Sequence, residues 1–309
     1  MTDSHLVAVV LAALGAVLFG LSAVRQHRAV QDTAVLRGGR GLGVRALVEL
    51  ARHPGWLLGS LQGVAGGAAH LAALALAPIT LVQPIGVLAV PVTVLGSAAA
   101  LGRRPGRPQV VGSACAVAGV TVLTLLLLQP PAHHVLLPAW WLPAAVVLGA
   151  TAVTAAVMVS AVGRPLVRSL VLAVAAAVLF GLEAVLLRTI GTIVAGHAVT
   201  AHLPLLLAAA VGVGLALPVG LWAMQSAYLS GSAEVVLCCL ALVDPVAAVL
   251  AGRLLLHDGV AASGPALVGA LGCTLVAGIG VLLLSRGYVG EGPLPSPVPV
   301  AGSGAARTG

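Results

Sequence analysis

The stretch LALAPITLVQPIGVLAVPVTVLGSAAALGRR, residues 74–104, has no charged residue before Arg103 and Arg104. A helix needs about 20 mostly apolar residues to cross the hydrocarbon core of a bilayer. The stretch therefore predicts the end of one membrane span and all of the next, with a turn at Pro78. The paired arginines at its end predict a loop in water.

Two prolines lie inside the second of these spans. A proline has no N–H, so the carbonyl four residues earlier loses its helical hydrogen bond. We expect Pro84 to free the carbonyl of Thr80 and Pro91 to free that of Val87. Gln83 adds a neutral donor and acceptor, so it is a candidate substrate- or ion-binding residue. The alternative is a proline kink bridged by neighbouring helices, with Gln83 among lipid headgroups.

The rest of the chain has the same apolar character. Sixty per cent of its 309 residues are hydrophobic and 7% are charged, against about 25% charged in an average soluble domain. This composition excludes a soluble enzyme, a secreted disulfide scaffold and a disordered polymer. It predicts an all-α polytopic membrane protein. We expect nine transmembrane helices at about 6–24, 56–78, 80–101, 109–128, 139–161, 168–188, 204–228, 232–252 and 263–285.

The arginines predict the orientation of the chain. It contains no lysine, and thirteen of its 15 arginines fall on one side of the predicted spans. Because basic loops stay in the cytoplasm, the N-terminus is expected outside and the C-terminus in the cytoplasm of a cell (plasma) membrane. The net charge of +7 comes from these loops, so no nucleic-acid partner is expected. The lack of lysine suggests a GC-rich bacterial genome and hence an inner membrane.

Two segments are not expected to span. Residues 41–53 place apolar residues on one helical face and Arg45, Glu49 and Arg52 on the other. This pattern is typical of an interfacial helix on the membrane surface, or of a solvated loop helix. The tail over 287–309 is rich in proline, glycine and serine, which predicts disorder.

An internal repeat divides the chain. The sequence AVLFGL occurs at 16–21 and again at 177–182. Pro91-Val92 matches Pro245-Val246, and Ala118-Gly119-Val120 parallels Ala277-Gly278-Ile279. We therefore predict two four-helix repeats joined by a linker helix. The expected domains are 1–131, the first repeat; 132–167, the linker helix; 168–286, the second repeat; and 287–309, the tail.

The linker helix reverses the direction of the second repeat, so the two repeats are predicted to be inverted. Inverted repeats recur in secondary transporters, whose substrate site lies near the midplane between the halves. Similar halves can exchange conformations, which opens the site first to one side and then to the other.

The proline-containing segments 74–104 and 242–259 resemble the paired proline helices of the drug/metabolite transporter superfamily. They are most similar to its EamA-like members and to the NIPA-like bacterial branch, which is related to magnesium transporters. AVLFGLSAVRQHRA, residues 16–29, resembles the first helix of that branch. The resemblance covers about residues 6–285 and implies a transporter of inverted repeats. The chain departs from the pattern in having segment 41–53 in place of a second spanning helix.

Asp244 is the leading candidate for the functional site. It lies near the middle of its predicted span, where an aspartate costs about 2.5–3.5 kcal/mol. The next residue, Pro245, is expected to free the carbonyl of Ala241. A carboxylate and a free carbonyl in one turn can hold a proton, a cation or a substrate amine, which makes Asp244 the candidate metal ligand. The alternative is a structural aspartate, protonated or bonded to a neighbouring helix.

His70 and Glu183 are the remaining candidate binding residues. His70 adjoins a helix face on which Gly59, Gly63 and Gly67 recur every four residues, a pattern typical of close helix packing. It is either a proton relay or a hydrogen-bonded packing histidine. Glu183 is expected about one and a half turns from the outer end of its span, where it lines a vestibule or extends to the headgroups.

Other polar residues favour structural interpretations. Glu234 follows Ser232 at the start of a span, which is typical of a helix cap. Gln225, Trp222 and Tyr228 are expected in the belt at the membrane interface. The pair His133-His134 is expected in an outer loop. Reduced, packed thiols are expected at Cys115, Cys238, Cys239 and Cys273.

Together these features predict a secondary transporter of a small metabolite or ion, with Asp244 as the proton- or cation-coupling group. A Mg²⁺ permease of the NIPA-like type is an alternative implied by the resemblance. A non-transporting membrane scaffold is a third. We expect no enzyme activity and no cofactor. The expected partners are the substrate and the lipid bilayer, and homo-oligomer formation is left open.

Overall fold

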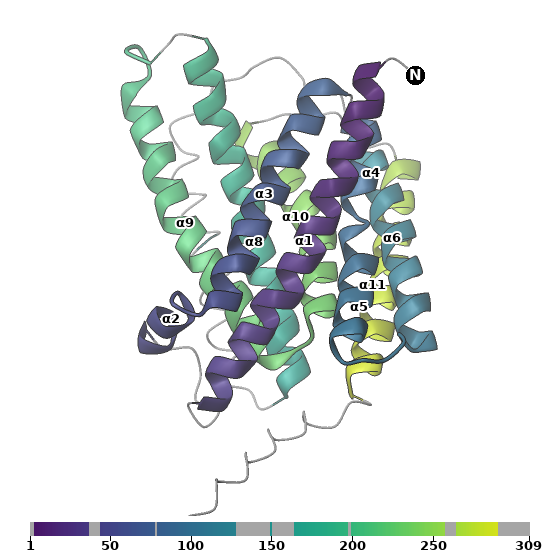
Figure 1. Ribbon diagram of the computed structural model, residues 1–309. Coiled ribbons are helices and arrows are strands. Elements are labelled where there is room, and N and C mark those ends of the chain that lie inside the picture. Colours follow the sequence, from purple (N-terminus) through teal and green to yellow (C-terminus); the bar gives the residue numbers. More distant parts are fainter. Residues whose placement is uncertain are drawn as a thin grey trace, which may run out of the picture.

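The computed structural model describes residues 3–36, 44–77, 79–127, 149, 164–196, 199–256 and 264–289. Within these ranges every regular element is an α-helix, and most helices run along one common direction (Figure 1). The all-α prediction is therefore confirmed for the described part of the chain. The helices are α1 (Asp3–Leu36), α2 (Val44–Leu50), α3 (Pro54–Leu76), α4 (Ile79–Gly86), α5 (Ala89–Ala100), α6 (Arg107–Leu127), α8 (Pro165–Ala195), α9 (Leu203–Ser230), α10 (Ala233–Leu256) and α11 (Gly264–Val289).

Several helices can cross a membrane. Long side chains cover the outside of the bundle, as at Leu271 and Leu275, which are 65% and 69% exposed. Small residues such as Ala8 and Ala12 are fully buried, as is typical of helices that associate in lipid. Of the expected span 139–161 the structure describes residue 149 alone, so the count of nine stays a prediction. The five described segments long and apolar enough to span are His5–Ala34, Arg107–Leu126, Pro165–Gly191, Leu203–Ser230 and Val268–Arg286.

The first helix of each predicted repeat is longer than expected. Helix α1 has 34 residues and α8 has 31. At 1.5 Å per residue α1 is about 51 Å long, well beyond the roughly 30 Å of hydrocarbon. The expected loop after residue 24 is therefore wrong, because the chain has no glycine or proline between Leu21 and Gly38 to stop the helix. Helix α11 likewise extends to Val289, three residues into the predicted tail.

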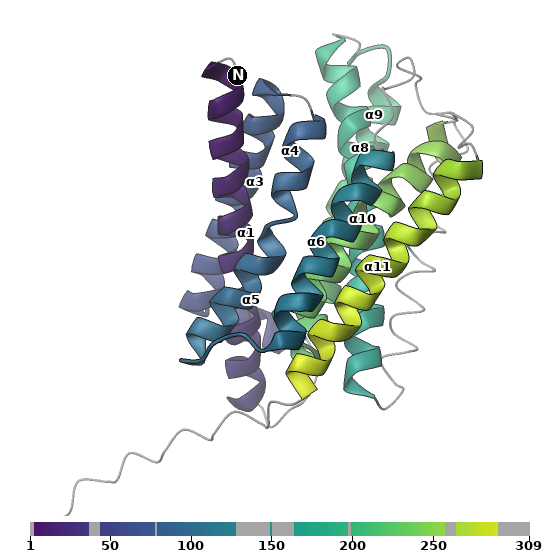
Figure 2. The same cartoon turned by 90° about the vertical axis from the view of Figure 1, so that its right-hand side faces the viewer.

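The predicted span 80–101 is two helices instead of one. Helix α4 ends at Gly86 and α5 begins at Ala89 (Figure 2). The N–H of Val90 donates to the carbonyl of Val87 at 3.0 Å, a tighter turn than that of an α-helix. The sequence predicts a free carbonyl at Val87. The structure shows instead that this carbonyl accepts a hydrogen bond. Pro91 cannot serve it, so the neighbouring N–H does, and the helix breaks there.

The arginines gather at one end of the bundle. Figure 1 places at its lower end the C-termini of α1 and α11, helix α2, the start of α8 and the α5–α6 connection. We call this the arginine-rich end. It confirms the predicted clustering, whereas the side that faces the cytoplasm stays a prediction. The described arginines on these elements are Arg25, Arg28, Arg45, Arg52, Arg103, Arg104, Arg107, Arg164, Arg168 and Arg286.

Helix α2 occupies 44–50, within the segment expected at the membrane surface. Its buried residues are Ala46 and Leu50, which join the main apolar core of the bundle. Val48, on the apolar face predicted to lie on the membrane, is 47% exposed, while Leu47 on the same face packs against the core. The preceding α1 also contacts α2. The membrane-surface interpretation and its loop-helix alternative both stay predictions.

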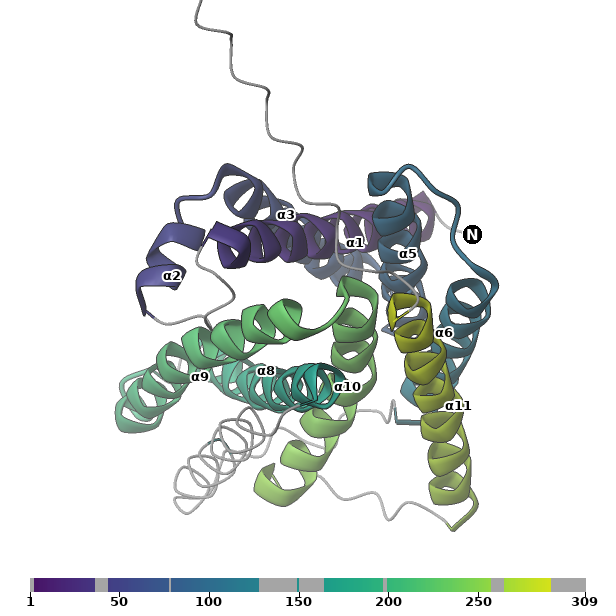
Figure 3. The ribbon, with the colours of Figure 1, turned by 90° about the horizontal axis from the view of Figure 1, so that it is seen from below.

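Helix pairing is similar in the two predicted repeats. Helix α1 packs on α3, α4 and α5, while α8 packs on α9 and α10. Helix α6 packs along α11, which joins the halves (Figure 3). Figure 1 shows that α1 runs from top to bottom and α8 from bottom to top.

The two AVLFGL segments make similar contacts. Phe19 of α1 lies over Gly67 of α3, with Cζ 3.9 Å from where a Cβ would stand. Phe180 of α8 lies over Gly220 of α9, with Cε1 2.8 Å from the equivalent position. The third match of the repeat is not reflected in the packing: Gly119 is tightly packed, whereas a Cβ at Gly278 would meet no atom within 4 Å.

Candidate functional site

The structure brings two carboxylates together inside the second half. Asp244 lies on α10 and Glu183 on α8, two helices that pack against each other. Both side chains are partly buried, and the charges are close enough to interact electrostatically. Asp244 stands eleven residues after Ala233, about 16 Å along the helix. The pair joins a residue expected at the site with one expected in a vestibule.

Glu183 lies further from the end of its helix than predicted. The expected span ended at residue 188, but α8 continues to Ala195, so Glu183 is about three turns from that end. Two carboxylates in apolar surroundings resist being ionised together, because each negative charge disfavours the other. A shared proton or a bound cation relieves this repulsion. The arrangement can therefore take up and release one positive charge.

His70 belongs to a different contact. Its Cε1 lies 3.1 Å from where a Cβ would stand at Gly86, the last residue of α4. Its backbone N lies 3.4 Å from the corresponding position at Gly15 of α1. Nδ1 is buried and has no hydrogen-bond partner among the described residues. The described contacts of His70 are therefore with the broken helix and α1, and the proton relay and the packing histidine both stay predictions.

The glycine face beside His70 differs slightly from the prediction. A Cβ at Gly59 or Gly63 would meet Ser22 and Gln26 of α1 within 4 Å. The next tight contact is at Gly66, where a Cβ would lie 3.1 Å from the carbonyl oxygen of Gly15, whereas a Cβ at Gly67 would meet only Cζ of Phe19, at 3.9 Å. The face turns from every fourth residue to every third because an α-helix has 3.6 residues per turn.

The other expected helix-break residues are only partly described. Gln83 and Pro84 lie within α4 and Pro245 within α10, but their side chains lie outside the described part of the structure. Helix α10 continues past Pro245 without a break. Val87, at the break of the first half, shares an apolar cluster with Leu242 of α10. The broken helix is therefore near the turn that carries Asp244.

A polar contact between α1 and α9 was missed at the sequence level. Gln225 of α9 donates its Nε2 to Oε1 of Gln26 at 2.5 Å, and Gln26 donates to Ser22 at 3.0 Å. Gln225 is only 2% exposed. The ring of Tyr228 lies edge-on to His27, with 5.9 Å between centroids.

The belt interpretation of Gln225 and Tyr228 is thus wrong. Both side chains are buried in protein, and Trp222 packs against the main apolar core. Ser22 and Gln26 are four residues apart, which places two polar side chains on one face of a helix. This pattern could have predicted a polar contact, but the predicted span ended at residue 24, before Gln26.

Side chains of α1 also satisfy the ends of other helices. Gln31 donates to the carbonyl of Tyr228 at 2.8 Å, and Arg28 donates to that of Ala100 at 2.5 Å. These carbonyls are in the last turns of α9 and α5, where no helical N–H remains to serve them. The C-terminal third of α1 therefore ties together helices of both halves at the arginine-rich end.

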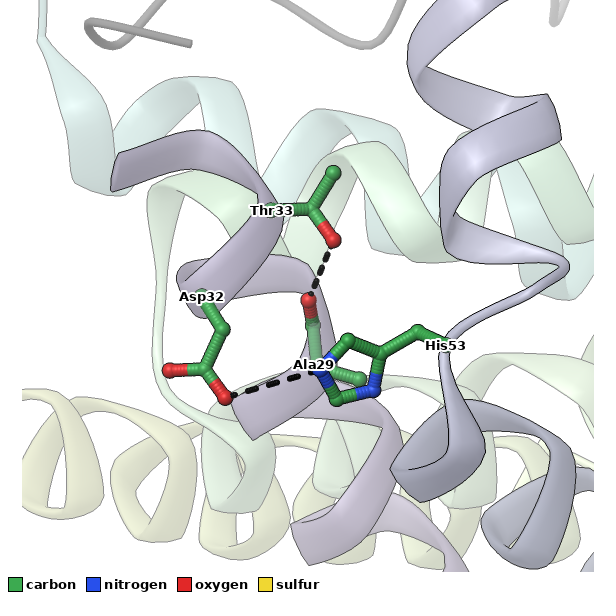
Figure 4. A network of polar contacts seen from close by, with 4 residues as sticks. All are labelled: Ala29, Asp32, Thr33 and His53. Atoms are coloured by element: carbon green, nitrogen blue, oxygen red, sulfur yellow. Dashed lines mark hydrogen bonds and ion pairs between the residues drawn. The ribbon is translucent and has the colours of Figure 1, made fainter. Parts of the chain in front are cut away.

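The end of α1 is also tied to the start of α3 (Figure 4). Nε2 of His53 lies 3.9 Å from Oδ2 of Asp32, and Thr33 donates to the carbonyl of Ala29 at 2.8 Å. Asp32 is 65% exposed. This pair is a surface contact and not part of the carboxylate site.

Ser232 acts as the predicted cap. Its Oγ accepts a hydrogen bond from the N–H of Val235 at 3.4 Å, in the first turn of α10. Glu234 lies in the same turn and is 5% exposed. Negative charge at a helix N-terminus is stabilised by the helix dipole. The capping interpretation is therefore confirmed for Ser232. Glu234 lies in the first turn of α10, where that interpretation places it.

The chemistry available in the described residues is limited. The four cysteines are free. No group of three His, Cys, Asp or Glu side chains forms a metal site in that part of the chain. His133 and His134, which are expected in an outer loop, lie outside it. No protein-family model matches the sequence, and neither a curated protein nor a solved structure matches it.

Proposed function

We propose that this protein is a secondary transporter of a small metabolite or ion that works by alternating access. The observation that supports this proposal most directly is the electrostatic interaction between Glu183 and Asp244, which lie on packed helices. Ionisable residues within membrane helices are costly and typically mark an ion or substrate pathway. The pair is the coupling site, which exchanges a proton or cation as the substrate binds and leaves.

The arrangement of the two halves supports this proposal. The similar helix pairing, the opposite directions of α1 and α8 and the matching Phe19 and Phe180 contacts favour an inverted repeat. The interrupted α4–α5 helix resembles in plan the discontinuous helices at transporter sites. On this proposal the chain is a drug/metabolite transporter of the EamA-like or NIPA-like type, in a bacterial plasma membrane with its arginine-rich end in the cytoplasm.

Magnesium permeation is the second candidate. Mg²⁺ keeps several waters and binds through one or two carboxylates. Asp244 alone is a poor ligand set, but Glu183 adds a second carboxylate within electrostatic reach. No third carboxylate is needed if carbonyls and water complete the shell. Inorganic Mg²⁺ is therefore the first cation to test.

The test is Mg²⁺ entry into proteoliposomes that contain an Mg²⁺-sensitive dye. We expect Asp244→Asn and Glu183→Gln each to lower the initial rate at least about tenfold, since each leaves one charge to hold the ion. Glu234→Gln is the matched control, because it removes a buried carboxylate from the same helix as Asp244. It is expected to retain most of the flux.

The alternatives give different results. Flux that survives both substitutions keeps the permease but removes the carboxylate site. If correctly folded wild type carries no Mg²⁺, small metabolites are screened for transport driven by an imposed proton gradient. Asp244→Asn and Glu183→Gln must then abolish transport of the metabolite that the wild type carries. A scaffold tolerates Asp244→Asn without any functional change and carries no substrate in either assay.

A further inference from the structure

The contact between α1 and α9 is confined to the arginine-rich end. Gln225 of α9 donates to Gln26 of α1, and Gln31 of α1 donates to the carbonyls of Tyr228 and Leu229 in α9. His27 of α1 lies edge-on to the ring of Tyr228 in the same contact. Toward its other end α1 instead packs Ala8 and Ala12 against α3 and Val82 of α4. The two halves are thus joined here by a polar contact at one end of α1.

This contact has no counterpart in the second half. The inverted repeat pairs α1 with α8 and α3 with α9, so the equivalent of the α1–α9 contact is one between α3 and α8. Among the described residues α3 and α8 are not one of the extensively packed helix pairs, and Figure 3 shows them apart. The α1–α9 contact is therefore formed while the equivalent α3–α8 contact is not. An inverted repeat allows a second state, in which the α3–α8 contact is formed and the α1–α9 contact is open.

We propose that the Gln26–Gln225 amide pair is a latch that closes the interface between the halves at the arginine-rich end. This inference rests on the proposed transport function. In the present state the latch is shut. When it opens, α1 and α9 separate at that end, and the carboxylate pair becomes accessible from there.

The hydrogen bonding of the latch makes it reversible. Gln225 donates to Gln26, but its own Oε1 is buried and has no partner in the described structure. Opening hydrates both amides, and water then satisfies the acceptor that is unsatisfied in the shut state. Neutral amides also leave no uncompensated charge when they part, in contrast to an ion pair. The closed state is therefore held by a contact that water can replace.

The test measures access to the site without requiring a substrate. Cys115, Cys238, Cys239 and Cys273 are first replaced by alanine. Ala241→Cys then places a reporter one turn from Asp244, and a membrane-impermeant maleimide is added from one side of the vesicle at a time. Arg104→Cys in a parallel sample identifies the arginine-rich side. Gln26→Ala with Gln225→Ala is expected to raise reporter labelling from that side by about threefold, the effect of one interhelical hydrogen bond in lipid.

Two further variants keep the test decisive. Gln109→Ala removes another buried glutamine at the same end, one whose Oε1 accepts a hydrogen bond from the N–H of Gly106, and it should leave labelling unchanged. Gln26→Cys with Gln225→Cys, joined by a short bifunctional thiol reagent, should prevent labelling from the arginine-rich side until the reagent is released by reduction. Recovery after reduction shows that the protein stayed folded.

The outcomes separate the latch from the proposed function. Labelling from the arginine-rich side that neither the alanine pair nor the cross-link changes overturns the latch. A cross-linked protein that still carries Mg²⁺ at the wild-type rate overturns it as well. If wild type carries no substrate but the cross-link still blocks access, the latch stands and the transport proposal fails.

Discussion

The contacts that join the two predicted repeats of this protein differ in kind, as two of them show. Along α6 and α11 the backbones touch: a Cβ at Gly280 would lie 2.7 Å from the carbonyl oxygen of Gly112, and one at Gly119 would lie 2.7 Å from the N of Ala277. Between α1 and α9 the contact includes the amide pair of Gln26 and Gln225, the bonds from Gln31 to backbone carbonyls of α9, and the rings of His27 and Tyr228. One contact is made by glycines and the other by long polar side chains.

The difference shows which contact can open. Lipid gives helices no hydrophobic reason to associate, so close packing and hydrogen bonds must hold them together. Backbone contact along α6 and α11 is lost completely if the helices part, since water or lipid cannot restore its dispersion energy. A hydrogen bond between amides is exchanged for one to water. We infer that the α6–α11 contact persists while the α1–α9 contact opens.

The largest effect is expected at the glycine contact. Gly280→Leu inserts a side chain against backbone atoms of Gly112 and Ala116 that cannot move aside. Overpacking costs about 1–3 kcal/mol and more where backbone must shift, so we expect the folded protein to be lost or its Tm to fall by at least about 5 °C. Melting in detergent, followed with a dye that labels buried Cys238 and Cys239 as they become exposed, measures this.

Gly272→Leu is the control for that substitution. Gly272 lies on the same helix, but a Cβ there would meet no atom within 4 Å. It should melt within about 1 °C of wild type, because surface substitutions away from structural contacts change little. An equal fall in Tm for Gly280→Leu and Gly272→Leu would show that α11 tolerates no large side chain at either position. The effect of Gly280→Leu could then not be assigned to the α6–α11 contact.

A smaller effect is expected at the polar contact. Gln26→Ala and Gln225→Ala should each destabilise the protein by about 1 kcal/mol. Their coupling in a double-mutant cycle should be about 0.6 kcal/mol, the average for hydrogen bonds between membrane helices. Unfolding in mixed micelles measures all four proteins. A coupling above roughly 2 kcal/mol is too strong for the proposed latch to open reversibly.

The smallest effect is expected at the surface pair of Figure 4. Asp32 lies 3.9 Å from His53 and is 65% exposed. Exposed pairs contribute about 0–1 kcal/mol because water and salt screen them. Asp32→Ala should therefore shift the Tm by less than about 2 °C and leave reporter access at Ala241→Cys unchanged. A large change in access would mean that the closed end is held by this pair as well as by the amides.

Much of the helical framework could be predicted from the sequence. Apolar runs separated by arginines fixed the approximate positions of α1, α6, α8, α9 and α11. The distribution of arginines predicted which helix ends lie together. Both follow from local composition, since lipid accepts apolar helices and excludes charged loops. Helix ends were less accurate, as at Leu36, because a helix stops at a breaker or a cap and not at the edge of an apolar run.

The candidate site was predictable only in part. Asp244 was identified because a lone carboxylate in an apolar run is costly. Its partnership with Glu183 was not, because that pair depends on how α8 and α10 pack. Gln225 and Tyr228 were assigned to the interface by their depth, and the structure buries them instead. Depth along a helix can be counted in sequence, but the direction in which a side chain faces cannot.

The sequence by itself determined that this protein is a helical membrane protein, where most of its helices lie and which ends are basic. These properties depend on the free energy of each segment in lipid or water. Only the tertiary structure decided that Pro91 breaks its helix and Pro245 does not, which face of α2 is buried, and that glutamines of α1 bond to α9. These depend on contacts between residues far apart in the chain, where the few atoms that meet decide the energy.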